Sequence, residues 1–140
     1  MKFTKFLFLI ACIALIAACK KEKKAADLNE TFDTSGATLL AQGSLAASAH
    51  STSGNIKLYS KGTEKTLVLE NFNTENGPDL NVYLSNSKTS AGFVDLGDLK
   101  SQKGTFYYTF SGSTNTDSLN NVLIWCVQYS VLFGNGTLVK

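Results

Sequence analysis

From residue 37 onwards, short apolar runs alternate with turns rich in Gly, Asn, Ser and Thr, at intervals of about ten residues. This spacing is typical of the short antiparallel strands of a β-sandwich or barrel. No stretch in this part of the chain carries the extended 3.6-residue period of an amphipathic helix. The pattern predicts one all-β domain over residues 37–140, which we expect to be a single antiparallel β-sandwich of about eight strands.

The individual strands follow from the apolar runs between the turns. The predicted strands are residues 38–49, 55–60, 65–72, 79–85, 93–99, 105–110 and 121–133, with residues 136–139 closing the chain. Strands 55–60 and 65–72 are expected to form a hairpin, because Gly62 between them supplies the positive φ that such a turn needs. Residues 111–120 are predicted to be a long polar loop.

The longest apolar run, residues 121–133, contains the only Trp of the chain. Its odd positions are all large and apolar: Leu123, Trp125, Val127, Tyr129, Val131 and Phe133. Its even positions begin apolar and become polar at Gln128. Because β-branched and aromatic residues dominate, a strand is favoured over a helix. We therefore predict a long central strand with Trp125 on the core face and Cys126 on the opposite face, partly buried.

The charge of the chain is unevenly distributed. All 13 basic residues are Lys, and six of them precede residue 25, where Glu22 is the only acidic residue. From residue 25 onwards 7 lysines face 10 acidic residues, a net formal charge of −3. A mildly acidic domain without Arg argues against nucleic-acid binding.

The N-terminus has the features of an exported protein. Lys2 and Lys5 precede an apolar run, residues 6–18, that is too short to span a bilayer as a stable helix. It ends in Ile16-Ala17-Ala18-Cys19, which resembles the lipobox of bacterial lipoproteins. This predicts a signal peptide (1–18), then a lipidated Cys19 and a flexible linker (19–36). The expected location is the bacterial cell envelope, with a lipid anchor holding the domain on the periplasmic face or at the cell surface. An ordinary secretory signal with an incidental cysteine is the alternative.

Export leaves Cys126 as the single free thiol, because Cys12 is removed with the signal peptide and the Cys19 sulfur becomes a thioether. A redox role and core filling both remain open for this residue. His50, the only His, is expected either to act as a base or ligand beside Cys126 or to hydrogen-bond its own turn. One Cys and one His do not supply a zinc site, so we predict no metal centre.

Several motifs resemble, in their order and spacing, the DM-thirteen domain. They include His50, Ser53-Gly54, Gly77-Pro78-Asp79-Leu80, Val82-Tyr83-Leu84, Ile124-Trp125-Cys126 and Phe133-Gly134. The resemblance implies a secreted, β-rich electron-transfer domain, often found beside DOMON domains. The family's cysteine is proposed to act as a bare thiol or as a ligand to a group such as haem. Of this sequence, only Cys126 matches that cysteine.

The expected function is an accessory redox or electron-transfer role through Cys126, with an unknown redox partner protein, since the chain carries no DOMON domain. A stand-alone enzyme is not indicated, because the sequence has no Gly-x-Ser-x-Gly motif, phosphate loop or Ser/His/Asp set. The alternative is a non-catalytic, adhesion-type module that binds a ligand or protein and in which the cysteine is structural. The aromatic residues Tyr83, Tyr107, Tyr108, Tyr129 and Trp125 are then candidates to line a groove for an aromatic or sugar ligand. Packing in the core or between neighbouring strands is the alternative for them.

Overall fold

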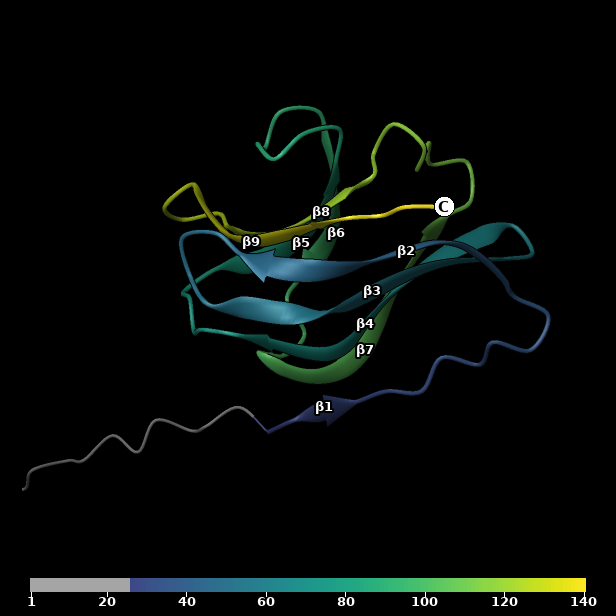
Figure 1. Ribbon diagram of the computed structural model, residues 1–140, viewed down its shortest axis with the longest axis horizontal. Helices are drawn as coiled ribbons and strands as arrows, with labels where there is room; N and C mark the ends of the chain where they lie inside the picture. Colours follow the sequence, from purple (N-terminus) through teal and green to yellow (C-terminus); the bar gives the residue numbers. More distant parts are fainter. Residues whose placement is uncertain (1–25) are drawn as a thin grey trace, which may run out of the picture.

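The computed structural model describes residues 26–140, which form nine β-strands (Figure 1). They are β1 (Leu28–Asn29), β2 (Thr38–Ala47), β3 (Thr52–Lys61), β4 (Glu64–Thr74), β5 (Leu80–Ser85), β6 (Phe93–Asp98), β7 (Lys103–Ser111), β8 (Asn121–Cys126) and β9 (Val131–Thr137). This confirms the all-β prediction. No helix in this part of the chain is long and apolar enough to cross a membrane. The predicted signal peptide and Cys19 lie outside the described residues.

All nine strands belong to one sheet, in the order β1-β7-β4-β3-β2-β9-β8-β5-β6. Neighbouring strands are antiparallel, except that β1 runs parallel to β7. The sheet curls on itself as a half-barrel, so that its concave face encloses the core (Figure 1). The predicted sandwich of eight strands is therefore not the architecture found. Strand lengths and turns do not distinguish two stacked sheets from one curled sheet, because both bury alternate residues.

Glycines allow the sheet to fold over at the contact between β2 and β9. These strands pair only at Ala46–Asn135 and Ala47–Gly134, with a further bridge between Gln42 and Val139. Between these points the backbones lie so close that a Cβ atom on Gly43 would overlap the carbonyl oxygen of Thr137. A Cβ on Gly136 would lie 2.5 Å from the carbonyl oxygen of Ser44. Only glycine fits such a close approach of two backbones.

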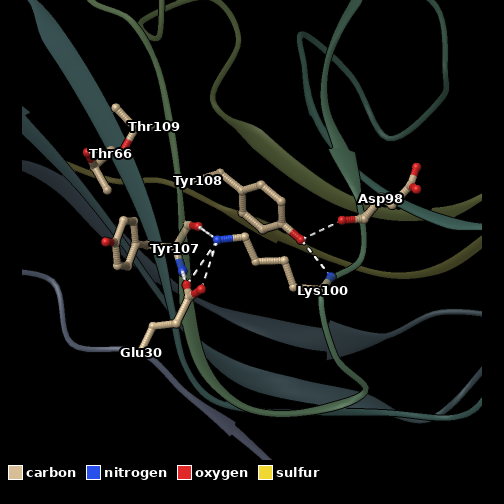
Figure 2. A network of polar contacts seen from close by, with 7 residues as sticks. All are labelled: Glu30, Thr66, Asp98, Lys100, Tyr107, Tyr108 and Thr109. Carbon is tan, nitrogen blue, oxygen red and sulfur yellow. Dashed lines mark hydrogen bonds and ion pairs between the residues drawn. The ribbon is translucent and has the colours of Figure 1, made fainter. Parts of the chain in front are cut away.

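A tyrosine links strands near the two opposite edges of the curled sheet (Figure 2). The hydroxyl of Tyr108, on β7, donates to the carbonyl oxygen of Asp98 at 2.9 Å and accepts from the backbone N–H of Lys100 at 3.0 Å. Burial raises the pKa of Tyr108 to about 12. The edge strand β6 is thereby joined to β7, which lies near the opposite edge of the sheet.

The segment before β2 adds a strand to the edge of the sheet beside β7. Leu28 and Asn29 pair with Gly104 and Thr105 of β7, and the carboxylate of Glu30 accepts hydrogen bonds from Nζ of Lys100 at 3.0 and 3.2 Å (Figure 2). Further along, the ring of Phe32 lies 5.3 Å from that of Tyr59 and 5.5 Å from that of Tyr107. This part of the expected flexible linker is therefore extended and packed, and it contains the short strand β1.

The predicted central strand, residues 121–133, is in fact a hairpin. β8 ends at Cys126, residues 127–130 form a turn, and β9 begins at Val131. The backbone N–H of Val127 donates to the carbonyl oxygen of Asp79 at 2.8 Å, and Ser130 adopts a positive φ of 52°. Apolar residues continue through the turn, which is why the period of two gave no sign of a chain reversal.

The predicted faces of β8 are also inverted. Val122, Ile124 and Cys126 belong to the core, whereas Leu123 and Trp125 lie on the outer face. The sequence pattern was ambiguous here because both faces of β8 are apolar, which normally indicates a strand that is covered on both sides.

Candidate functional site

Cys126 lies at one end of the half-barrel, here called the thiol end and made up of Cys126, His50, Glu75, Leu80 and Phe133. Cys126 is 1% exposed and is the only free cysteine among the described residues. Its backbone pairs with Leu80 of β5 on one side and with Val131 of β9 on the other. The thiol is thus fully buried at the end of a strand that has neighbours on both sides, rather than partly buried as predicted.

His50 caps the core at the same end. Its ring stacks on that of Phe133, with 3.9 Å between the centroids and 29° between the planes. Its Nδ1 lies 2.8 Å from Oε2 of Glu75, and the other oxygen of Glu75 accepts from the backbone N–H of Ser51 at 3.2 Å. The hydrogen bonds from His50 and Ser51 lower the pKa of Glu75. The pair links the β2–β3 turn to the β4–β5 loop.

A buried pair of threonines continues this link below the surface. The hydroxyls of Thr52 and Thr74 lie 3.0 Å apart, and the hydroxyl of Thr74 also donates to the carbonyl oxygen of Ser51. A Cβ atom on Gly134 would overlap the side chain of Thr52, so glycine is needed at this position. The polar groups below His50 are therefore satisfied by one another, as buried polar groups generally are.

Phe133 connects the two halves of the thiol end. The ring of His50 stacks on that of Phe133. The Cζ atom of Phe133 also lies 2.8 Å from the position that a Cβ atom on Gly77 would occupy. The same Cβ would lie 2.8 Å from Cδ2 of Leu80, whose backbone pairs with Cys126. The motifs around His50, Gly77, Cys126 and Phe133, which are far apart in the sequence, therefore converge at one end of the fold.

The structure does not join His50 and Cys126 directly. In the part of the chain that is described, the ring of His50 hydrogen-bonds Glu75 and makes no hydrogen bond to the thiol. Sequence reasoning missed Glu75 as the partner of His50, since 25 residues separate them and the polar loop around Glu75 resembled an ordinary turn. The backbone pairing of strands β3 and β4 brings the two together: Thr52 is opposite Thr74, one residue before Glu75.

Two of the cavities in the described part of the chain lie at opposite ends of the half-barrel. A small one of about 290 Å³ adjoins the thiol end and is lined by residues 77–80 and 98–102. A larger open groove of about 1070 Å³ lies at the other end, where Leu39, Leu58, Leu138 and Val139 meet the polar loop after β7. Cys126 and His50 line neither cavity.

The surroundings of Cys126 do not fit a haem or a metal ion. Its thiol is enclosed by apolar side chains, with no cavity of haem size beside it, and His50 is already engaged by Glu75 and Phe133. Among residues 26–140, no three His, Cys, Asp or Glu side chains gather closely enough to hold a metal ion.

These features define a small, single-sheet β domain whose described residues contain one buried thiol, with several motif residues at the same end of the sheet. The chain matches the family model described as Electron transfer DM13 over residues 44–138. Because the match covers most of the chain, the protein belongs to this family, as its motifs predicted. No curated protein and no solved structure shows significant similarity to the chain.

Proposed function

We propose that the protein is a lipid-anchored domain of the bacterial cell envelope with an accessory role in electron transfer, in which Cys126 is the redox residue. The observation that carries the proposal is membership of an electron-transfer family, together with the position of Cys126 among the converging motifs of the thiol end. Residues 26–140 contain one thiol and form no disulfide among themselves, so the oxidised form would be a mixed disulfide with a partner protein. The thiolate of Cys126 would attack a disulfide of that partner and bond to one of its sulfurs. The other sulfur would leave as a thiolate and take up the proton lost by Cys126, so the partner's disulfide is the oxidant.

The burial of Cys126 restricts how such a reaction proceeds. A thiolate is the reactive form of cysteine, and an apolar enclosure disfavours it. The thiol would therefore react only when a partner opens the turn that follows β8. This makes Cys126 slow towards small oxidants and selective for a protein that binds at that turn.

Attachment to the membrane rests on the sequence Ile16-Ala17-Ala18-Cys19. The variant Cys19→Ala should move the protein from the membrane to the soluble fraction of its host. An unchanged membrane fraction would contradict the lipid anchor without affecting the redox proposal.

The redox role is tested with protein purified from its own host. We expect one titratable thiol per chain after unfolding, and loss of envelope electron-transfer activity in Cys126→Ala and Cys126→Ser alike. The matched control is Ile124→Val, which alters the neighbouring core position but keeps the thiol. If both cysteine variants retain full activity, Cys126 has no redox role.

The second candidate function is a non-catalytic binding module in which Cys126 fills the core. Its support is the 1% exposure of Cys126 and the open groove of about 1070 Å³ at the other end of the fold. Full activity of Cys126→Ala, combined with lost activity when Leu39 and Val139 at the rim of the groove are changed to Ser, would favour this function.

A further inference from the structure

The outer face of β6, β5 and β8 is unusually apolar for a sheet surface. The ring of Tyr83 is stacked between those of Phe93, at 4.2 Å and 15°, and Trp125, at 6.4 Å and 22°. Phe93 is 42% exposed, and Val127 and Tyr129 in the turn after β8 are 41% and 65% exposed. The face of an antiparallel sheet that lies away from the core is normally polar, and contiguous exposed apolar groups indicate a binding surface.

Two acidic residues belong to the strands that carry these rings: Asp95 lies on β6, and Asp79 directly precedes β5, where its carbonyl oxygen accepts from the N–H of Val127. Asp95 is held by the side-chain amide of Asn81 at 3.0 and 3.2 Å and by the backbone N–H of Gly97 at 2.8 Å. The pKa of Tyr83 is raised, first by burial and then by the charges of Asp95 and Asp79, so both carboxylates act on this ring. Within residues 26–140, Asp79 and Asp95 form no salt bridge, whereas six other acidic residues do.

We propose that this surface, made up of Phe93, Tyr83, Trp125, Asp79 and Asp95 and called here the aromatic face, is the docking site of a partner protein. The partner is expected to present Lys or Arg residues around an apolar contact. Opposite charges accelerate encounter and orient the partner, and the apolar centre holds it. The inference deepens the proposed function and rests on it, because Trp125 directly precedes Cys126 and the exposed turn of residues 127–130 directly follows it.

The same features argue against other occupants. A second copy of the chain in a twofold dimer would place like carboxylates near one another. An anionic bilayer would be repelled by Asp79 and Asp95. Small-molecule sites are concave, but Phe93, Tyr83 and Trp125 line none of the cavities of about 290, 420 and 1070 Å³ in residues 26–140; of the aromatic face, only Asp79 lines one, the cavity of about 290 Å³.

Binding is tested with basic cytochrome c as a probe, because its lysines surround an exposed haem edge and the haem quenches Trp fluorescence. Trp125 is the only Trp of the chain, so the full-length protein in detergent reports directly from the aromatic face. We expect saturable quenching at low ionic strength that decreases as salt is added. Cytochrome c with acetylated lysines should not quench, because acetylation removes the positive charge.

Variants locate the binding surface. Asp79→Asn should weaken binding about three- to fivefold, whereas Glu64→Gln, an equal loss of charge at the far end of the sheet, should change it less than about twofold. Phe93→Ala should weaken binding at every salt concentration, since its contribution is apolar. Equal effects of Asp79→Asn and Glu64→Gln, or no effect of Phe93→Ala, would overturn the proposal. A dimer in sedimentation that Phe93→Ala dissociates would assign the aromatic face to a second copy instead.

The test of the docking proposal can be distinguished from the test of the redox role of Cys126. The Phe93→Ala variant keeps Cys126, so its thiol titre should equal that of the wild-type protein. Failure of the docking proposal appears as unchanged binding by Phe93→Ala, whereas failure of the redox role appears as full host activity of Cys126→Ala.

Discussion

Cys126 and Trp125 are neighbours in the chain, but their side chains lie on opposite faces of β8. Cys126 is buried in the core, whereas the indole of Trp125 lies on the outer face beside the ring of Tyr83. A reagent in solvent therefore meets the indole first and reaches the thiol only when the packing opens. The reactivity of Cys126 is thus coupled to the local stability of β8 and of the turn that follows it.

Alkylation of Cys126 should report this coupling. In the native protein we expect alkylation to be slower than in urea-unfolded protein by several orders of magnitude, since opening of the core is required. Thiol labelling followed by mass spectrometry measures both rates. Native and unfolded rates within about tenfold of each other would mean that the thiol is accessible through local motion.

Replacing Cys126 should reveal the polarity of its surroundings. Cys126→Ala is expected to cost little stability, whereas Cys126→Ser should cost about 1–3 kcal/mol more, because it buries a hydroxyl without a partner. Urea unfolding of the two variants gives the difference. Equal stabilities would show that a hydrogen-bond acceptor lies within reach of the side chain at this position.

Trp125 should contribute less to stability than its size suggests. Because its ring lies on the outer face, Trp125→Ala is expected to cost about 1–2 kcal/mol, less than the 3–5 kcal/mol typical of a buried Trp. Ile124→Ala on the core face should cost about 2–5 kcal/mol. Urea unfolding measures the loss of stability in both variants. A larger loss for Trp125→Ala than for Ile124→Ala would show that the indole is buried in the core.

The sequence predicted the strands well because each apolar run is bounded by turn residues. The hairpin at Gly62, for example, has the expected positive φ of 60°. The prediction of one long strand failed at residues 121–133, because Val127 and Tyr129 continue the alternation of apolar residues through a turn. Both are exposed in the turn. A local pattern does not distinguish an apolar core face from an apolar binding surface, since both need the same side chains.

The candidate site was predictable only in part. His50 and Cys126 could be singled out because each is the only residue of its kind in the expected mature domain. Their partners could not, because Glu75 and Phe133 reach His50 through sheet register and through a turn. The spacing of residues along the sequence does not reveal such contacts. The close approach at Gly43 was equally invisible, since it depends on how β2 meets β9 in space.

Gly43 should tolerate no side chain. In Gly43→Ala the added methyl group would overlap the carbonyl oxygen of Thr137, so β2 and β9 must separate. We expect a loss of about 3 kcal/mol, the upper end of the range typical of overpacking. The control is Gly36→Ala, where φ is +71° but nothing lies within 4 Å, so only backbone strain of about 1–2 kcal/mol is added. Thermal unfolding ranks the two, and equal losses would contradict the close contact.

Tyr108→Phe should weaken the connection between the two ends of the sheet. The variant leaves the carbonyl oxygen of Asp98 and the N–H of Lys100 without their hydroxyl partner, which should cost about 1–3 kcal/mol at pH 8. Tyr107→Phe is the matched control, because its hydroxyl makes no hydrogen bond within the described chain. Equal losses for the two variants in urea would show that the bonds of Tyr108 contribute nothing.

The same variant should change the pH dependence of stability. The pKa of Tyr108 is about 12 in the folded protein and near 10.0 in a free tyrosine, so the folded state binds this proton more tightly. The resulting stability is complete below pH 10 and is lost as the pH rises towards 12. The wild-type protein should therefore lose stability faster than Tyr108→Phe over this range, and the gap between them should narrow. Both proteins contain the same lysines, so any contribution of the lysines cancels in the difference between the two stabilities. Tyr107→Phe retains Tyr108, so it should show the same loss of stability with rising pH as the wild-type protein. If instead the stabilities of the wild-type protein and Tyr108→Phe fell in parallel with pH, the hydroxyl of Tyr108 would be exposed to solvent.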